Sequence, residues 1–223
     1  MKTPAYDFVL PIRTEETLRR FVRLALGVTI PDVQVCADHQ TPWRAFAAAY
    51  FAKSSVIVWE ASRGFGGKSF LLAALGLTEA LTVKANVNLL GGSGEQAERV
   101  HEYMGRFWQY QNAPRQLLTG DPIARGTRLA GGNRIQVLMA SSKSVRGPHP
   151  ERLRIDEVDE VAVDLLDAAL GQTMASDQVP AQTVLSSTHQ YPDGTMTEVL
   201  QRAAAKAWPV YKWCYKESSA QPG

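Results

Sequence analysis

The sequence predicts an α/β fold with a mostly parallel sheet flanked by helices and preceded by a short helical lead-in. Two observations predict it. Short apolar runs rich in β-branched residues alternate with helical segments along most of the chain, and strands separated by helices pair in parallel through right-handed crossovers. A glycine-rich turn also lies directly between one such run and the next helix, which is where a phosphate-binding loop occurs.

Two helices are expected ahead of the first strand. Thr14 is a suitable N-cap for a helix with an acidic first turn, and Gly27 suits its end. Thr41 followed by Pro42 begins a second helix, which should extend to about residue 52.

The remaining elements alternate. We expect strands at 56–59, 88–90, 135–140, 153–155, 183–186 and 210–215. We expect helices at 70–80, 93–110, 163–174 and from 195 to before 209. Two of these helices begin with a capping-box pattern, Ser93 with Gln96 and Thr195 with Glu198. Loops are expected at 91–92, 126–132 and 178–180.

The length of 223 residues suits one large domain with appendages. We divide it into a lead-in at 1–36, a core at 37–217 and a flexible tail at 218–223. Hydrophobic residues make up 45% of the chain and charged residues 21%, an ordinary globular composition that needs no disulfide or metal to fold. No apolar run reaches the ~18 residues of a membrane helix, and the first residues lack the apolar segment of a signal peptide. Membrane and secreted classes are therefore not expected.

Charge is unevenly placed although the net charge is only +2. Residues 99–154 are rich in Lys and Arg, whereas residues 155–198 contain acids and no Lys or Arg. Either these are two solvated faces, or a polyanion-facing segment precedes a metal-facing one. Cys36 and Cys214 lie far apart in sequence and show no ligand spacing, so we interpret the two cysteines as reduced structural thiols and do not expect a zinc scaffold. The four histidines, His39, His101, His149 and His189, show no ligand spacing either, and we interpret none of them as a metal ligand.

The strongest motif is the segment 62–69, with a strand predicted before it and a helix after it. Its nucleotide-binding candidates are Ser62, Arg63, Gly64, Phe65, Gly66, Gly67, Lys68 and Ser69. Glycines allow successive backbone amides to face phosphate oxygens, and the helix N-terminus adds its dipole. Lys68 would bind the β- and γ-phosphates of ATP, and the Ser69 hydroxyl would ligate Mg²⁺. Ser62 stands where the usual pattern has its first glycine. The alternative is a glycine-rich turn with a chance Lys-Ser pair.

A second motif, Asp156-Glu157, ends the predicted strand 153–155. An Asp at this place can hold Mg²⁺, and the adjacent Glu can orient and polarise the attacking water. Arg154 interrupts the strand and two further acids follow closely, so a solvated acidic turn is the alternative.

Together these motifs resemble the ATPase domain of the large terminases of tailed phages, the motors that package DNA. The phosphate loop begins Ser-Arg-Gly-Phe-Gly, an Arg-Gly at 146–147 lies about ten residues ahead of Asp-Glu, and Ser-Thr-His follows a strand at 187–189. The resemblance spans residues 40–189 and implies a P-loop NTPase fold of the ASCE, RecA-like class.

The resemblance also implies roles for individual residues. Gln40 is similar to a glutamine that reads adenine, Arg63 to a phosphate-sensing arginine, and Arg146 to an arginine finger that reaches the ATP of a neighbouring subunit. An extra glycine in the loop leaves the register of Arg63 relative to Lys68 open. A surface glutamine, and an arginine paired with Asp156 or Glu160 in the same subunit, are the alternatives for Gln40 and Arg146.

Ser187, Thr188 and His189 resemble the family's coupling motif, for which a capped strand end is the alternative. The resemblance implies an ATP- and Mg²⁺-dependent motor that forms a ring on a portal protein, works with a small terminase subunit and moves double-stranded DNA into a procapsid in the host cytoplasm. DNA contacts are expected from Arg125, Arg128 and Arg134 in the basic segment, through backbone charge rather than base reading.

Other functions are open at this point. A helicase-like ATPase would share these motifs but usually carries a second RecA-like domain, and a nucleotide-gated scaffold would leave Glu157 idle. The family's RNase H-like nuclease does not fit in the few residues after Tyr215. We therefore expect no DNA cleavage by this chain, either because it is an isolated motor domain or because the nuclease is a separate polypeptide.

Overall fold

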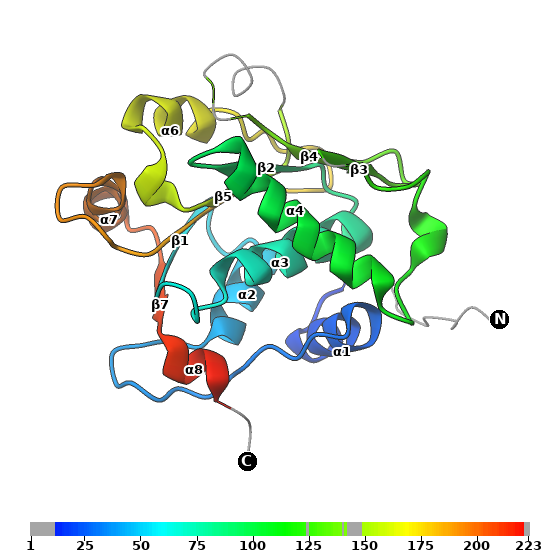
Figure 1. The fold of residues 1–223 in the computed structure, drawn as a ribbon, viewed down its shortest axis with the longest axis horizontal. Helices are drawn as coiled ribbons and strands as arrows, with labels where there is room; N and C mark the ends of the chain where they lie inside the picture. Colours follow the sequence, from blue (N-terminus) through cyan, green and yellow to red (C-terminus); the bar gives the residue numbers. More distant parts are fainter. Residues whose placement is uncertain (1–11, 124, 140, 142–148, 221–223) are drawn as a thin grey trace.

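A seven-stranded sheet forms the centre of the molecule (Figure 1). The structure is a computed structural model and describes residues 12–123, 125–139, 141 and 149–220. Across the sheet the strands run β3 (Gly126–Arg128), β4 (Arg134–Val137), β2 (Val87–Gly91), β5 (Arg152–Asp156), β6 (Gln182–Ser187), β1 (Val56–Ala61) and β7 (Val210–Trp213). All neighbours pair in parallel except β3 and β4, so the predicted α/β class is confirmed.

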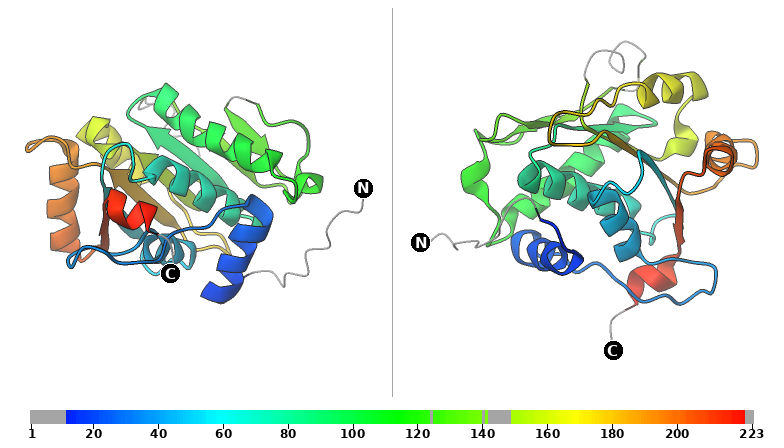
Figure 2. Two further views of the ribbon diagram at one scale, coloured as in Figure 1. Left: turned by 60° about the horizontal axis from the view of Figure 1, so that its bottom comes forward. Right: turned by 180° about the vertical axis from the view of Figure 1, so that it is seen from behind.

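Helices cover both faces of the sheet (Figures 1 and 2). One face packs against α1 (Glu15–Leu26), α2 (Pro42–Tyr50), α3 (Lys68–Thr82) and α4 (Gly94–Gln109). The other packs against α6 (Val163–Leu170) and α7 (Thr195–Lys206). Successive strand residues belong to different apolar clusters, because side chains alternate across a strand. In β1, for example, Ile57 and Trp59 face the first layer and Val58 the second.

Helix boundaries agree with the sequence prediction where local capping decides them. Thr14 caps α1, and its hydroxyl accepts a hydrogen bond from the Thr17 amide. Gly27 ends the helix in the left-handed conformation. Thr41 caps α2, and Ser93 with Gln96 forms the expected capping box of α4.

Three predictions of secondary structure are wrong. The helix expected to reach residue 174 ends at Leu170, just before Gly171. Residues 126–132 do not form a loop throughout, because β3 pairs with β4 there. The last strand ends at Trp213, and a short helix, α8 (Tyr215–Ser219), includes the first two residues of the expected tail.

The capping box expected at Thr195 is also absent. Gly194 occupies the N-cap position of α7, and the Thr195 hydroxyl donates instead to the carbonyl of Val161, at 2.6 Å. Asp159 takes over part of the capping, since its carboxylate accepts the Met196 amide at 2.8 Å. A distant carboxylate thus satisfies a helix end that the local pattern assigns to a neighbouring side chain.

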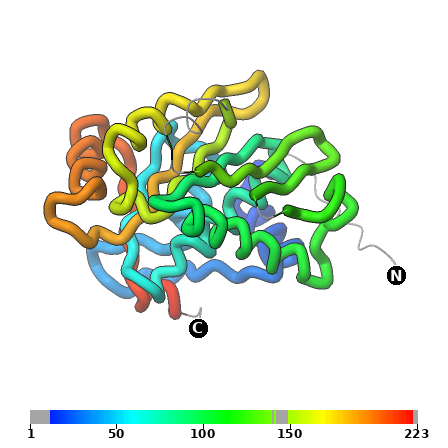
Figure 3. The backbone as a smooth tube through the Cα atoms, turned by 45° about the horizontal axis from the view of Figure 1, so that its top comes forward, coloured from blue at the N-terminus to red at the C-terminus, as the bar shows by residue number. Residues whose placement is uncertain are grey.

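The described residues also form two short 3₁₀ turns, at Arg115–Leu117 and at Val158–Glu160 directly after the Asp-Glu motif. Residues 110–123 lie at the opposite end of the molecule from residues 190–206 (Figure 3). No helix among the described residues is long and apolar enough to cross a membrane.

Candidate functional site

The carboxyl ends of three parallel strands meet at one edge of the sheet. β6 lies between β1 and β5 and pairs with both. The segments that follow the three strands therefore lie side by side: the glycine-rich loop after β1, Glu157 after β5 and Thr188 after β6. Ligands of open α/β sheets bind at this edge, so the motifs predicted separately from the sequence belong to one place.

The glycine-rich loop joins β1 to α3, whose first residue is Lys68. Gly64 and Gly67 adopt left-handed backbone conformations, with φ of +73° and +68°. A Cβ atom on Gly66 would lie 2.4 Å from the Ser62 carbonyl oxygen, so only glycine allows this close approach. Ser62 does not have a positive φ, so the loop does not need a glycine at its first position.

The side chain of Lys68 contacts the backbone at the start of this loop. Its side chain is buried, and the ammonium donates to the carbonyl oxygens of Ala61 and Ser62, at 3.3 and 3.2 Å, and to the Thr188 hydroxyl, at 2.8 Å. Burial lowers the pKa of Lys68, and the carboxylates of Glu157 and Asp156 oppose that change. The ammonium therefore lies among the ends of β1, β5 and β6, and its role with phosphate stays a prediction.

Ser69 and Asp156 form a contact that suits a divalent cation. The Ser69 hydroxyl donates to Oδ2 of Asp156. Burial raises the pKa of Asp156 to about 6, from an ordinary value of 3.8. Its second oxygen, Oδ1, is buried and has no hydrogen-bond partner among the described residues. Mg²⁺ prefers carboxylate and hydroxyl oxygens, so the Ser69–Asp156 pair fits such an ion. Oδ1 of Asp156, which has no hydrogen-bond partner among the described residues, has lone pairs available for it.

Glu157 holds a strained backbone conformation, with φ +49° and ψ +54°. The left-handed region costs an ordinary residue roughly 1–2 kcal/mol. Its side chain is half-buried, and its carboxylate makes no hydrogen bond with any described residue. Strain of this kind concentrates at functional sites, and Glu157 lies close enough to Lys68, together with Asp156, to affect the pKa of that lysine.

The end of β6 is tied to the segment after Glu157. The Ser187 hydroxyl accepts the Asp159 amide at 3.2 Å and donates to the carbonyl of Thr188 at 3.0 Å. Asp159 in turn accepts the backbone amides of Gln190 and Tyr191, both at 3.0 Å. The sequence indicated Asp159 only as part of an acidic turn, and no local pattern marks it as the residue that organises this loop.

His189 extends the same connection to α7. Its Nε2 lies 2.8 Å from the hydroxyl of Thr197, in the first turn of that helix. Together with the Lys68–Thr188 contact, these bonds link the phosphate loop to α7 through the end of β6.

A shallow hollow of about 190 Å³ lies beside the phosphate loop. It is lined mostly by apolar groups, from Val28, Thr29, Ile30, Pro31, Pro42, Gly66, Gly67, Phe70, Leu71 and Ser218. The sequence did not mark the extended segment 28–31 as part of the site, because its residues have no recognisable motif. The hollow is an apolar surface next to the loop, where a nucleobase could lie.

Comparison with solved structures finds large terminases. The HK97 bacteriophage large terminase superposes with a TM-score of 0.68 at 15% sequence identity, over 95% of this chain and 46% of that one. The large terminase of a thermophilic bacteriophage superposes with a TM-score of 0.61 at 11% identity, over 80% and 47%. A structure of that second terminase in complex with ADP gives 0.56 at 11% identity, over 80% and 47%.

This chain has the fold of phage large terminases. It spans about half the length of the structures it matches. No protein-family model and no curated protein sequence matches it. At such low identity the likeness shows the fold, which agrees with the fold-level expectation from the motifs.

The glutamine that the terminase resemblance singled out has a structural contact. Oε1 of Gln40 accepts the backbone amide of Lys212 at 2.9 Å, and the backbone amide of Gln40 donates to the Lys212 carbonyl at 2.8 Å. These two bonds fasten the segment before α2 to β7. Gln40 does not line the hollow beside the phosphate loop, and its role with adenine stays a prediction.

Of the two arginines that the terminase resemblance singled out, Arg63 is among the described residues and Arg146 is not. Arg63 is exposed, and its guanidinium donates to Oε1 of Gln190 at 3.2 Å. It lies close enough to Lys68 to contribute to lowering that residue's pKa, after burial. Arg146 lies outside the described residues, so its reach, whether to a neighbouring subunit or within its own, stays a prediction.

Arg125, Arg128 and Arg134 lie at the far edge of the sheet from the phosphate loop, on or beside β3 and β4. They are exposed and line a hollow of about 370 Å³. Arg125 pairs with Glu98 at 2.8 Å. The three arginines are therefore exposed at one edge of the sheet, and their contact with DNA stays a prediction.

The basic segment is not a continuous surface. Arg152 and Arg154, at its end, are buried in β5 and face Glu79 of α3. Arg154 donates from Nε to Oε2 of Glu79 at 3.1 Å and from Nη2 to Oε1 of Gln182 at 3.0 Å. Arg152 and Arg154 therefore belong neither to a solvated face nor to a polyanion-facing one. Their ion pairs with Glu79 explain why an arginine interrupts the strand.

Proposed function

We propose that this chain is the ATP-hydrolysing motor domain of a viral large terminase that moves double-stranded DNA into a procapsid. The observation that supports it most is the meeting of Lys68, the Ser69–Asp156 pair and Glu157 at the ends of three neighbouring strands. This arrangement suits ATP hydrolysis, and the fold is that of large terminases. The large terminase of the thermophilic bacteriophage was solved in complex with ADP and with ATP-gamma-S.

In this proposal the loop amides and Lys68 bind the triphosphate, and Arg63 contacts it from the exposed side of the loop. Ser69 and Asp156 would hold Mg²⁺, which offsets the charge of the phosphate oxygens when bound. Glu157 orients a water molecule and accepts its proton. The water oxygen then bonds to the γ-phosphorus while the bond to the β–γ bridging oxygen breaks, giving ADP and phosphate. The adenine would lie near Gln40 or in the apolar hollow.

Arg146 would act as an arginine finger on the ATP of a neighbouring subunit, an arrangement worth roughly 10³–10⁵ in rate. Ser187, Thr188 and His189 would transmit the state of the γ-phosphate. Their hydrogen bonds to Asp159 and Thr197 support this role. Arg125, Arg128 and Arg134 would grip the DNA backbone. A ring on a portal protein, a small terminase partner and a location in the host cytoplasm complete the proposal.

The first test is turnover of the purified chain with ATP and Mg²⁺, with and without linear duplex DNA. We expect Glu157→Gln to bind ATP but to hydrolyse it at least about a hundredfold more slowly, and Lys68→Ala to lose nucleotide affinity. Glu102→Gln and Lys53→Ala, both outside the site, are matched controls. Equal turnover in Glu157→Gln and the wild type would remove the proposed base and favour a scaffold.

The second test concerns the arginine finger. Activity per subunit should rise with protein concentration, and Arg146→Ala should bind ATP normally while hydrolysing it poorly. Turnover that is independent of concentration and unaffected by this substitution would reject a role between subunits. Separation of forked duplex strands would favour the helicase-like alternative, and metal-dependent nicking of DNA would overturn the expectation of no cleavage.

A further inference from the structure

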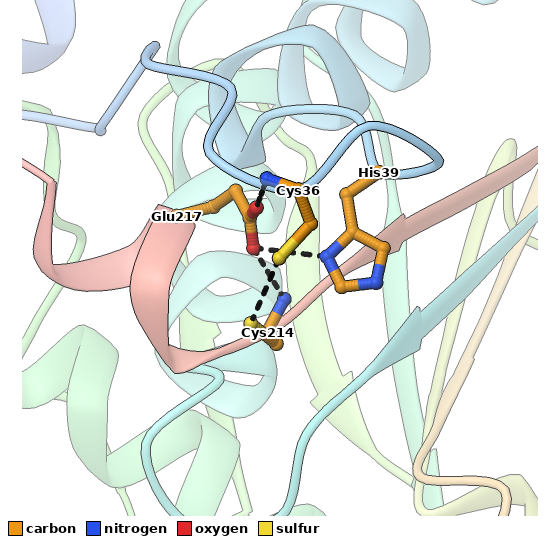
Figure 4. A group of neighbouring side chains, drawn as sticks. All are labelled: Cys36, His39, Cys214 and Glu217. Atoms are coloured by element: carbon orange, nitrogen blue, oxygen red, sulfur yellow. Dashed lines mark hydrogen bonds and ion pairs between the residues drawn. The ribbon is translucent and has the colours of Figure 1, made fainter.

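Four potential metal ligands form a cluster on the side of the molecule where α8 meets the segment before α2 (Figure 4). They are Cys36, His39, Cys214 and Glu217, and one ligand atom of each lies within 4.8 Å of all the others. The sequence interpretation treated the two cysteines and His39 separately, whereas the structure brings them together. The cysteines are 178 positions apart in the chain, yet their sulfur atoms lie 4.0 Å apart.

The separations are close to those around a tetrahedral zinc ion. Bonds of about 2.3 Å from zinc to sulfur place two thiolates about 3.8 Å apart, and bonds of about 2.0–2.1 Å place nitrogen and oxygen ligands about 3.4 Å apart. The structure has 4.0 Å between the sulfurs and 3.0 Å between His39 Nδ1 and Glu217 Oε2. Since the longest separation is 4.8 Å, the four atoms need to move by no more than about one ångström.

The surrounding backbone already orients the ligands. Oε1 of Glu217 accepts the Cys36 and Val35 amides at 2.7 and 3.3 Å, and Oε2 accepts the Cys214 amide at 2.9 Å. The sulfur of Cys214 accepts the Lys216 amide at 3.4 Å. Hydrogen bonds of this outer kind fix ligand orientation in metal sites. Glu217 is fully buried, so its carboxylate is held in place before any ion arrives.

We propose that Cys36, His39, Cys214 and Glu217 bind one zinc ion. The ligands come in two pairs with the same spacing, Cys-x₂-His and Cys-x₂-Glu, which is short enough for both members of a pair to reach one metal. The two thiols lose their protons to solvent as the ion binds, and His39 binds as the neutral imidazole. Four protein ligands close the coordination shell, which is typical of a structural rather than a catalytic site.

The ion would hold residues 213–218 against the glycine-rich loop. The residues beside the cluster already contact that loop, because Trp213 donates from its indole nitrogen to the Gly66 carbonyl at 2.7 Å and the Ser218 hydroxyl donates to the same oxygen at 3.1 Å. Zinc would join residues 36–39 to residues 214–217, and so fix the positions of these two segments beside the glycine-rich loop. The inference does not require the proposed hydrolysis of ATP, since metal content can be measured directly.

The experiment measures metal in the full chain, purified without a metal-binding tag and reconstituted with zinc under reducing conditions. We expect one zinc per chain by elemental analysis. Cys36→Ser and Cys214→Ser should each lose it, and His39→Ala should lower its affinity at least tenfold. His149→Ala, which changes a histidine outside the cluster, is the matched control and should keep it. Less than a tenth of an equivalent, or retention in both cysteine variants, overturns the proposal.

A second measurement needs no variant and so does not depend on variant folding. Cobalt(II) added to the metal-free wild type should produce a thiolate-to-cobalt charge-transfer band that saturates at one equivalent and disappears when zinc is added. Hydrogen exchange at residues 33–40 and 214–219 should slow when zinc is bound. A cobalt spectrum without thiolate bands, or a chain that is two hydrogens lighter in mass because the cysteines form a disulfide under the same reducing conditions, refutes the site.

Discussion

Asp156 is expected to destabilise the metal-free protein at neutral pH. Burial raises its pKa to about 6, from 3.8 for an unperturbed carboxyl. The folded state therefore disfavours the charged form. Below about pH 4 the group is protonated in both states and no cost arises; the cost grows as the pH rises from about 4 to 6 and is complete above that. The difference in pKa corresponds to roughly 3 kcal/mol.

Asp156→Asn removes this cost because an amide carries no charge. In buffer without added Mg²⁺ at about pH 7.5, we expect the variant to be more stable than the wild type by up to about 3 kcal/mol, reduced by the cost of burying an amide. At about pH 4 the two proteins should differ little, since the wild-type carboxyl is largely protonated in the folded state. Urea unfolding at both pH values measures the difference, with the exposed Asp193→Asn as control.

The same substitution should abolish Mg²⁺-dependent hydrolysis if the proposed function holds. A gain in stability that accompanies a loss of activity would identify Asp156 as a carboxylate kept for its ligand. The reasoning is refuted if the stability difference between variant and wild type is the same at both pH values, because a titrating carboxyl cannot produce a constant difference. Destabilisation at pH 7.5 would equally contradict it.

Three further predictions concern the neighbourhood of the site. Glu79→Gln leaves Arg152 and Arg154 buried without a countercharge and should lower the free energy of unfolding by about 3–5 kcal/mol in urea; a loss below about 1 kcal/mol would show that the pair is dispensable. Glu157→Gly should unfold at a higher temperature than Glu157→Gln, because glycine adopts the left-handed conformation without strain; equal melting temperatures would contradict this. Thr188→Val removes an acceptor that holds Lys68 away from phosphate, so ATP should bind up to about fivefold more tightly by calorimetry, as expected for one hydrogen bond of about 1 kcal/mol; weaker binding would reject the competition.

The sequence predicts well what local chemistry decides. The alternation of strands and helices, the caps at Thr14 and Ser93 and the glycine-rich loop all appear as expected. Each depends on residues within a few positions of one another, where capping and glycine conformations are strong local preferences. Lys68 and Asp156 could be named as candidate site residues for the same reason, because their motifs lie within a few positions of predicted strands.

What the sequence did not predict depends on contacts between distant segments. Asp159 caps α7 from 37 positions away, and no local pattern reveals such a partner. Arg154 appeared to interrupt a buried strand because its countercharge, Glu79, lies 75 positions earlier. Cys36 and Cys214 appeared unrelated because the hydrogen bonds that join their segments, such as those of Gln40 with Lys212 and of Cys36 with Glu217, link residues more than 170 positions apart.

Two chains of contacts lead away from the candidate site, and they reach different surfaces. The first runs from Lys68 through Thr188 and the β6 end to α7. The second begins after Glu157, where Glu160 packs so closely on the β2–α4 turn that a Cβ on Gly92 would lie 2.4 Å from the Cβ of Glu160.

The second chain of contacts continues along α4. Glu98, in the second turn of that helix, pairs with Arg125. Packed groups and an ion pair therefore connect the segment after Glu157 to Arg125, whereas no described side chain connects Arg128 or Arg134 to α4 by an ion pair. If the basic edge of the sheet binds DNA, Arg125 is the arginine through which the state of the nucleotide can alter that binding. Arg128 and Arg134 then serve mainly to hold the DNA backbone.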